Sequence, residues 1–313
     1  MKLFKPKFWQ RKNYFFPILL LPLTCLVVLF TFLKKTFRKK KFFSIPVICV
    51  GNIYIGGTGK TPLSIHLAKE ITKRGKNPAI IRKYYAAHED EHNLIKNYFG
   101  NLFLDKCRLR AIDKACKMNH DAAILDDGLQ DYQINKDLSI VCFNEKQFIG
   151  NGLVIPSGPL RERLNAIQDA HIVIINGEKS TEIEKKILKY NEKLKIFYSK
   201  YQPLNLDDFK NKPLVALAGI ANPDNFFDLI ERNNLNIAEK LVYPDHYQFS
   251  KKEISQLVEN YQKKNFQIIM TEKDYFKIKD FNILNINFLK VRLVIEDQDK
   301  LIDRIMKLYD KTI

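Results

Sequence analysis

VICVGNIYIGGTGKT, residues 47–61, joins an apolar run to a glycine-rich segment and the start of an amphipathic helix. The run 47–50 is predicted to be a buried strand, and the helix is expected to reach about Arg74 before Gly75 ends it. A strand, a glycine-rich loop and a helix N-terminus form a phosphate cradle, because main-chain N–H groups and the helix dipole face the anion. The predicted nucleotide-binding residues are Gly56, Gly57, Thr58, Gly59, Lys60 and Thr61.

Two side chains of this loop carry the expected chemistry. Lys60 supplies a mobile positive charge for the phosphates, and the Thr61 hydroxyl suits Mg²⁺. The strict P-loop pattern has a glycine five residues before Gly59, where this chain has Tyr54. A glycine-rich turn that merely precedes Lys-Thr is the alternative, but the flanking strand and helix favour a nucleotide site.

The 313 residues suffice for two α/β units, and their formal charge of +17 is unevenly distributed. Residues 1–41 contain eleven Lys/Arg and no Asp or Glu, which leaves +6 for the remaining 272 residues. The excess therefore favours attraction to an anionic membrane surface over nucleic-acid binding. Five cysteines without a CxxC pair are typical of a reducing compartment.

An uncharged apolar segment, YFFPILLLPLTCLVVLFTFL, occupies residues 14–33. As one helix it would be about 30 Å long, which is enough for a hydrocarbon core. Basic residues flank it on both sides and no small-residue cleavage site follows, so a membrane helix is favoured over a buried soluble helix or a signal peptide. Residues 1–41 are thus predicted to anchor the chain, and spanning and one-leaflet insertion both stay open.

Strands and helices alternate after residue 42, which predicts a P-loop NTPase-like, doubly wound parallel α/β domain at 42–203. The strand 122–125 ends in Asp126-Asp127, the usual place for carboxylates at a Mg²⁺ site, although a simple turn is the alternative. The long segment 144–169 contains IGNGLVIPSGPLRE and is interpreted as a functional loop, with a surface connector as the alternative. The polar run 88–92 alone reads as a solvated helix start.

A second, smaller Rossmann-like α/β domain is expected at 204–313, with the option that its last helix packs back on the first domain. Its predicted strands are 214–218, 237–242, 266–270 and 286–293, and its last helix is 300–309. Lysine in Thr271-Glu272-Lys273-Asp274 comes one position too late for the guanine-binding motif of GTPases, so guanine recognition is not expected.

Six motifs in the same order resemble one family, tetraacyldisaccharide 4′-kinase, the membrane-associated kinase of lipid A synthesis. They are VGNIYIGGTGKTP (50–62), DDGLQDY (126–132), FIGNGLVIPSGPLRE (148–162), LAGIANPDNFF (217–227), YPDHYQF (243–249) and MTEKDYFK (270–277). The resemblance implies transfer of the ATP γ-phosphoryl group, with Mg²⁺, to the 4′-hydroxyl of a tetraacylated glucosamine disaccharide 1-phosphate. It also implies two Rossmann-like domains joined by a hinge, with the lipid-embedded acceptor in a cleft at the cytoplasmic face of a bacterial inner membrane, and no obligate protein partner is inferred.

The resemblance also implies roles for individual residues. Those matched to catalysis are Asp90 as the base, His246, Lys60, Arg161, Glu162 and Arg108, and those matched to the metal are Thr61, Asp126, Asp127 and Glu91. The family's Ser-Arg-Gly-Tyr is here Ile81-Arg82-Lys83-Tyr84, and its Gly-Asp-Glu-Pro is Glu89-Asp90-Glu91-His92. The assignments of Asp90, Glu91 and Arg108 depend on this altered stretch.

Two other interpretations remain open at this point. One is a membrane-tethered P-loop ATPase switch of the partitioning or targeting type, although such proteins usually have a lysine where this chain has Ile55. The other is a lipid-binding paralogue without turnover, which the altered stretch 81–92 would explain.

Overall fold

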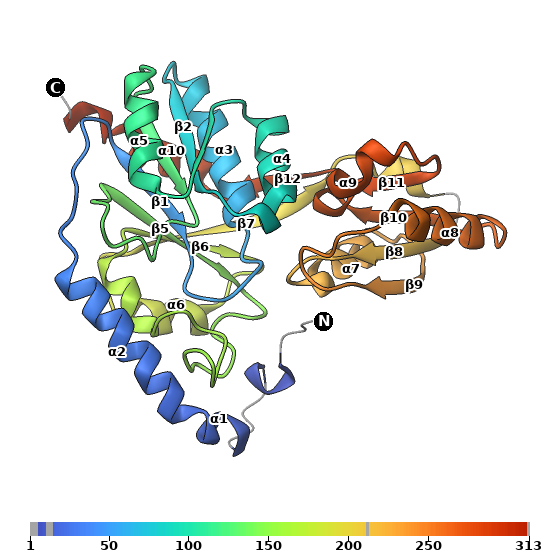
Figure 1. Ribbon diagram of the computed structural model, residues 1–313, viewed down its shortest axis with the longest axis horizontal. Coiled ribbons are helices and arrows are strands. Elements are labelled where there is room, and N and C mark those ends of the chain that lie inside the picture. Colours follow the sequence, from blue (N-terminus) through green and yellow to red (C-terminus); the bar gives the residue numbers. More distant parts are fainter. Residues whose placement is uncertain (1–5, 11–14, 211–212, 312–313) are drawn as a thin grey trace. The chain divides into compact units, whose positions relative to one another are not determined.

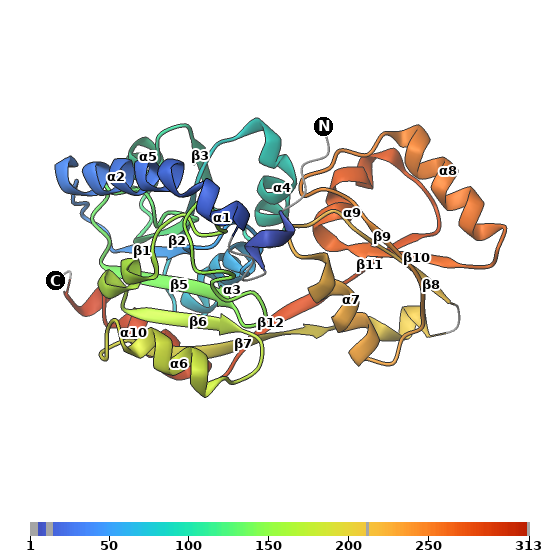
Figure 2. The same cartoon turned by 90° about the horizontal axis from the view of Figure 1, so that it is seen from below.

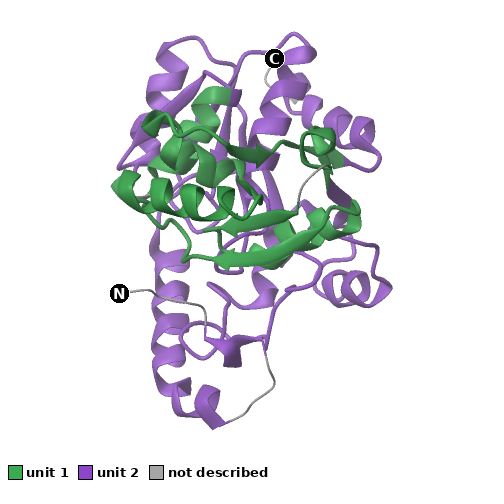
Figure 3. Ribbon diagram, turned by 90° about the vertical axis from the view of Figure 1, so that its right-hand side faces the viewer, with its two compact units in different colours: residues 1–4, 85–97, 201–294 green, residues 5–84, 98–200, 295–313 purple. Residues whose placement is uncertain are grey.

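The computed structural model describes residues 6–10, 15–210 and 213–311 (Figure 1). Contacts within the chain divide it into two compact units, which Figure 3 colours separately. In the described parts, unit 1 contains residues 85–97 and 201–294, and unit 2 contains the residues before 85 together with 98–200 and 295–311. Unit 1 is therefore built from two separate stretches of sequence. The expected domain ranges 42–203 and 204–313 stay predictions.

The larger sheet has eight strands, and β1 stands where the order of strands reverses. The strands are β1 (Val47–Gly51), β2 (Pro78–Lys83), β3 (Leu102–Asp105), β4 (Ala122–Asp126), β5 (Leu138–Asn144), β6 (Ile172–Asn176), β7 (Lys195–Pro203) and β12 (Val291–Ile295). Their order is β12-β7-β6-β5-β1-β4-β2-β3, and β1 to β7 pair in parallel. The expected parallel α/β fold is confirmed, and a loop after β1 lies at the switch point where such sheets bind ligands.

Amphipathic helices cover this sheet in unit 2 (Figure 1). They are α3 (Lys60–Lys73), α5 (Arg108–Lys117), α6 (Thr181–Leu188) and α10 (Gln298–Met306). In α3 the buried apolar side chains Leu63, Leu67 and Ile71 recur every four residues, which places them on one face of the helix. α10 packs against α3, so residues 295–311 return to unit 2.

Unit 1 contains a four-stranded parallel sheet in the order β11-β10-β8-β9. Its strands are β8 (Leu214–Ala218), β9 (Ile237–Val242), β10 (Gln267–Thr271) and β11 (Ile286–Leu289), and its helices are α4 (Glu89–Tyr98), α7 (Pro223–Arg232), α8 (Lys251–Gln262) and α9 (Glu272–Ile278). The Ser250 hydroxyl accepts the Glu253 N–H at 3.2 Å, so the cap expected at the start of α8 is confirmed. Short 3₁₀ helices are η1 (Lys7–Trp9), η2 (Ala86–His88), η3 (Leu164–Asp169), η4 (Leu206–Phe209), η5 (Lys279–Phe281) and η6 (Tyr309–Lys311).

The single strand predicted at 286–293 is wrong, because the chain changes sheets within it. β11 ends at Leu289 in the smaller sheet, and β12 begins at Val291 in the larger one. Between them the Lys290 N–H donates to Asn205 Oδ1 at 2.8 Å, and the Lys290 carbonyl accepts the Leu204 N–H at 2.9 Å. An apolar pattern that continues across the break gives no sign that the partner strand changes.

The single helix predicted at 14–33 is also wrong. Tyr14 lies outside the described residues, and the rest forms α1 (Phe15–Leu19) and α2 (Leu21–Phe37). Pro22 lies in the first turn of α2, where its missing N–H costs nothing, whereas in the interior of one long helix it would remove a hydrogen bond. Among the described residues, no helix has both the length and the apolar character that crossing a membrane requires.

Both N-terminal helices lie at the outside of unit 2 (Figure 2). They are fixed there by polar contacts to the loop 148–162. The Thr24 hydroxyl lies 2.8 Å from that of Ser157, which in turn lies 2.9 Å from the Pro17 carbonyl. The opposite side of the helices exposes Phe15, Phe16, Ile18, Leu19, Leu23, Leu26, Leu29, Phe30, Phe32 and Leu33. Unit 2 thus presents an apolar surface, which we call the N-terminal apolar face.

Candidate active site

The loop between β1 and α3 in unit 2 has the form of an anion cradle. Gly56 and Gly59 have φ values of 94° and 88°, which a residue with a Cβ rarely adopts. Gly59 is the N-cap of α3, and no side chain caps this helix. Its first N–H groups are therefore available to a phosphate. Asn52 shapes the loop, because its amide donates to Thr58 Oγ1 at 2.9 Å and to the Gly56 carbonyl at 3.2 Å.

Lys60 begins α3 and faces a carboxylate beyond β4. Its ammonium lies 3.6 Å from Asp127 Oδ1, and only 11 % of its side chain is exposed. Burial lowers the pKa of Lys60, whereas the Asp127 charge partly restores it. For Asp127 burial acts in the opposite direction, but Lys60 and Arg161 outweigh it and hold the pKa of Asp127 well below its usual range. Asp127 is therefore a carboxylate at neutral pH.

Asp126, at the end of β4, is fully buried and surrounded by donors. Its oxygens accept the hydroxyls of Thr61 at 3.0 Å and Ser64 at 3.1 Å. Arg82, on β2, contacts the same oxygen as Thr61 and forms an ion pair with it. Hydroxyl and carboxylate oxygens are the ligands that Mg²⁺ prefers, so Thr61, Asp126 and Asp127 fit this ion.

Arginines fix the chain around these two aspartates. Arg108 donates to the main-chain carbonyls of Asp126 at 3.1 Å and Asp127 at 2.7 Å. Arg161 donates to Asp127 Oδ1 at 2.8 Å. Glu162 accepts the Gln130 amide at 2.9 Å, and that amide also donates to the Asn52 carbonyl at 3.0 Å. The loop 148–162 therefore bonds to the segment after β4, and its Pro159 carbonyl also accepts the Ile55 N–H of the P-loop at 2.9 Å.

A second group of charged residues lies in unit 1 and contains Asp90 and His246. Asp90, in the first turn of α4, is 3 % exposed, and both its oxygens lie 3.1 Å from His246 Nδ1. His246 lies between β9 and α8 with a φ of 58°, a backbone geometry that costs about 1–3 kcal/mol in a non-glycine residue. Such strain persists only where the surroundings fix it, which is typical of functional positions.

Two lysines of α9 complete this group. Lys273 Nζ lies 3.1 Å from Glu91 Oε1 and 3.6 Å from Asp90 Oδ2, and Lys277 Nζ lies 3.7 Å from Asp90 Oδ2. Burial raises the pKa of Asp90, but the hydrogen bond with His246 and the positive charge of Lys273 outweigh it and lower the pKa to about 2. Asp90 is therefore a carboxylate at neutral pH. Asp274 fixes Lys277 at 2.7 Å and accepts the Gly219 N–H at 2.8 Å.

The structure thus gathers the expected site residues into two sets. Lys60, Thr61, Arg108, Asp126, Asp127 and Arg161 contact one another in unit 2, and Glu162 joins them through Gln130, whereas Asp90, Glu91 and His246 lie together in unit 1. Glu91, which was expected at the metal, lies 3.1 Å from Lys273 Nζ and 3.8 Å from His88 Nδ1 in unit 1. The assigned roles themselves stay predictions.

Sequence reasoning missed several residues of these sets. They are Asn52, Ser64, Arg82, Gln130, Lys273 and Lys277. Lys273 and Lys277 lie in the motif MTEKDYFK, which marked this segment as functional. The sequence does not indicate that their partner is Asp90. The buried Arg82 belongs to the apolar strand β2, and in the sequence it stands out only as part of an altered motif.

Comparison with known proteins gives concordant results. The family model for tetraacyldisaccharide-1-P 4'-kinase matches residues 16–310. A protein of Pelagibacter ubique (strain HTCC1062), named tetraacyldisaccharide 4'-kinase, is 42 % identical over 99 % of this chain and 100 % of its own length. A protein of the same name from Rickettsia canadensis (strain McKiel) is 33 % identical over 98 % of each chain.

Among solved structures, this chain is similar to one described as "apo" form LpxK from Aquifex aeolicus in complex with ATP. The TM-score is 0.71, and the match covers 94 % of this chain and 99 % of that one. At 22 % sequence identity this likeness supports the α/β fold.

Proposed function

We propose, from the premise that this chain belongs to the tetraacyldisaccharide-1-P 4'-kinase family, that it is an ATP-dependent kinase of lipid A synthesis. Its acceptor is then the 4′-hydroxyl of a tetraacylated glucosamine disaccharide 1-phosphate. The observation that carries this function beyond ATP binding is the contact between Asp90 and His246, because a buried carboxylate held by an imidazole suits proton removal from an acceptor hydroxyl.

The nucleotide is assigned to unit 2. The open N-terminus of α3 and the positive φ at Gly56 and Gly59 suit the phosphates, and Lys60 and Arg161 supply positive charge. We assign Mg²⁺ to the oxygens of Thr61, Asp126 and Asp127. The ion supplies charge neutralisation for the phosphoryl oxygens when it is bound. The chain's own contribution is to hold these oxygens in place through Ser64, Arg82 and Arg108.

We assign the removal of the proton from the sugar hydroxyl to Asp90. Phosphoryl transfer through a loose transition state requires a well-positioned base but not a strong one. A carboxylate with a low pKa therefore suffices. His246 holds this carboxylate through Nδ1, which fixes the direction of its free lone pairs. Lys273 and Lys277 keep it ionised. Asp90 is then the catalytic base, and His246 is a positioning residue.

We assign the membrane contact to the N-terminal apolar face. Apolar side chains are exposed on one side of these helices, and polar contacts join the other side to unit 2. This is the pattern of a helix that lies in the membrane surface. Lys34 and Lys35 end α2, and four more basic residues follow at 38–41, which suits anionic headgroups. We infer one-leaflet attachment at the cytoplasmic face of the inner membrane, where ATP and the lipid acceptor meet.

A single assay tests the proposed function against its alternatives. Purified protein, [γ-³²P]ATP and Mg²⁺ are incubated with the tetraacyldisaccharide 1-phosphate in detergent micelles, and labelled lipid is separated from labelled phosphate. Transfer to the 4′-position supports the kinase. Steady release of phosphate without lipid would favour an ATPase switch, and lipid binding without transfer would favour an inactive paralogue.

A further inference from the structure

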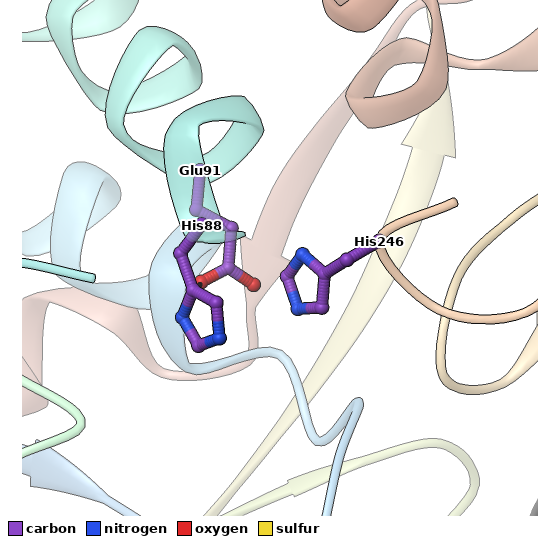
Figure 4. Close-up of side chains that lie close together, drawn as sticks. All are labelled: His88, Glu91 and His246. Carbon is purple, nitrogen blue, oxygen red and sulfur yellow. Dashed lines mark ion pairs between the residues drawn. The ribbon is translucent and has the colours of Figure 1, made fainter. Parts of the chain in front are cut away.

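We propose that His88, Glu91 and His246 bind one divalent transition-metal ion of the zinc class. Each offers one ligand atom, and the three atoms lie within 4.8 Å of one another. Figure 4 shows the three side chains converging from η2, from the first turn of α4 and from the loop after β9. All three belong to unit 1, so the site is contained in one compact body.

The donor set decides which class of ion fits. Two imidazoles and one carboxylate are a set that Zn²⁺ accepts, whereas Mg²⁺ prefers oxygen ligands and retains its water. Asp245 Oδ2 lies 3.8 Å from His246 Nε2 and is a candidate for the fourth position. Within the described contacts, carboxylates outnumber ammonium groups here, since Asp90, Glu91, Asp245 and Asp274 face Lys273 and Lys277. The excess of negative charge favours a cation.

Hydrogen bonds already orient two of the three ligands. His246 Nδ1 faces the Asp90 carboxylate at 3.1 Å, which fixes the proton on Nδ1 and leaves the lone pair of Nε2 for an ion. A carboxylate behind a ligating histidine is the usual second shell of a zinc site. Lys273 holds Oε1 of Glu91 at 3.1 Å, and Oε2 is the oxygen nearer to His88, with Nδ1 at 3.8 Å.

Binding requires one local movement. The rings of His88 and His246 are stacked, with centroids 4.4 Å apart and planes inclined by 2°. An ion lies in the plane of each imidazole that binds it, so two parallel stacked rings cannot share one ion. Rotation of the His88 ring about its Cβ–Cγ bond breaks the stack and turns a nitrogen toward Nε2 of His246. The ion thus replaces a ring stack by two coordinate bonds.

Occupancy has a consequence that rests on the proposed function. A dication on Nε2 of His246 fixes the imidazole that positions Asp90. It also occupies the side of His246 that is not used by Asp90. The site therefore makes the kinase sensitive to inhibition by zinc.

Binding is tested first, and independently of activity. The full chain in detergent is titrated with Zn²⁺ by calorimetry in a chelator-buffered solution, alone and in excess Mg²⁺. The variant His88→Gln is compared with His171→Gln, which removes an exposed histidine of unit 2. We expect one ion per chain in the wild type and in His171→Gln, with no competition from Mg²⁺. His88→Gln should bind at least about tenfold more weakly, since even second-shell changes cost 10–100-fold.

A second titration with Co²⁺ identifies the ligands. Tetrahedral nitrogen and oxygen coordination gives intense d–d bands without a thiolate charge-transfer band, and His246→Gln should abolish these bands. Equal Zn²⁺ affinity in wild type and His88→Gln would overturn the site, as would a thiolate band, which would place the ion on cysteine. Inhibition is then measured for each variant relative to its own metal-free rate. Binding that depends on His88 in a protein without kinase activity would refute the proposed function and leave the metal site intact.

Discussion

Both carboxylate oxygens of Asp90 lie 3.1 Å from Nδ1 of His246, although 156 residues separate the two in sequence. The carboxylate is almost fully buried, and the imidazole is held by a backbone of positive φ. A buried carboxylate that is held by a residue with a strained backbone is typical of a functional position, and the proposed function gives Asp90 the role of proton acceptor.

Asp90→Asn and His246→Gln should each lower kcat by roughly 10²–10⁴-fold with little change in ATP binding, because each disables the same positioned base. The double variant should be scarcely worse than the worse single one, since the two residues act as a unit. Initial rates of lipid phosphorylation check this. Glu89→Gln is the matched control, since Glu89 is exposed on the same turn. Fully multiplicative losses would show that the two residues act separately.

Lys60→Ala should lower the rate of transfer on the order of 10²–10³-fold, because it removes one preorganised charge from the phosphates. The fold should stay intact, but the melting temperature should fall somewhat, because Asp127 loses one of the two cations that keep it ionised. Lys73→Ala is the control on the same helix, where the lysine is exposed and paired with Glu70. Turnover of Lys60→Ala at the wild-type rate would refute the nucleotide site.

Lys273→Met should move the acidic limb of the kcat/KM profile to higher pH. In the wild type the pKa of Asp90 is about 2, and burial raises it once the positive charge of Lys273 is gone. Rates measured from pH 4 to pH 8 show the shift. Lys279→Met, which removes an ammonium over the Phe276 ring, should leave the limb in place. A variant profile identical to the wild type would exclude this control of Asp90.

The same depressed pKa predicts a pH dependence of stability. A carboxyl with a lowered folded-state pKa stabilises the fold above its unfolded value of about 4, and this contribution is lost as the pH falls toward 2. Lys273→Met should therefore cost on the order of 1 kcal/mol of unfolding free energy at neutral pH and progressively less below pH 4. Urea unfolding at several pH values measures the difference, and a difference that grows on acidification would contradict this account.

Replacing Leu26, Leu29 and Phe30 together by Gln should weaken binding to phosphatidylglycerol vesicles by at least about tenfold, because apolar area no longer enters the bilayer. These side chains are 53–62 % exposed, so the fold should tolerate the change. Leu284→Gln is the control, since Leu284 is 80 % exposed in unit 1. Vesicle sedimentation and unchanged thermal unfolding are the two measurements. Undiminished sedimentation of the triple variant would place the membrane contact elsewhere.

Local sequence signals predicted the nucleotide cradle well. The strand 47–50, the loop glycines and the helix that follows depend on neighbouring residues, and their positions agree with β1 and α3 within one residue. The same holds for Asp126 at the end of β4, because the end of an apolar run is visible in the sequence. Interactions of this kind need no knowledge of distant residues.

Long-range relationships were less accessible. A sheet change at Lys290 depends on Asn205, 85 residues away, and no periodicity records it. The polar run 88–92 looked like a solvated helix start, yet α4 buries Asp90 and His92. Partners from α9 and from the loop that contains His246 stabilise the buried carboxylate of Asp90. Their proximity to Asp90 is a property of the fold.

The discontinuity of unit 1 also limits when this protein can fold during translation. Residues 85–97 leave the ribosome long before residues 201–294, so the nascent α4 must wait for α9 and the loop that contains His246. Unit 2 waits as well, since α10 packs on α3 only after residues 295–311 have been made. Neither unit can complete its fold from the stretch of chain that is synthesised first. Unit 1 therefore completes its fold only after residues 201–294 have left the ribosome, and unit 2 only after residues 295–311 have done so.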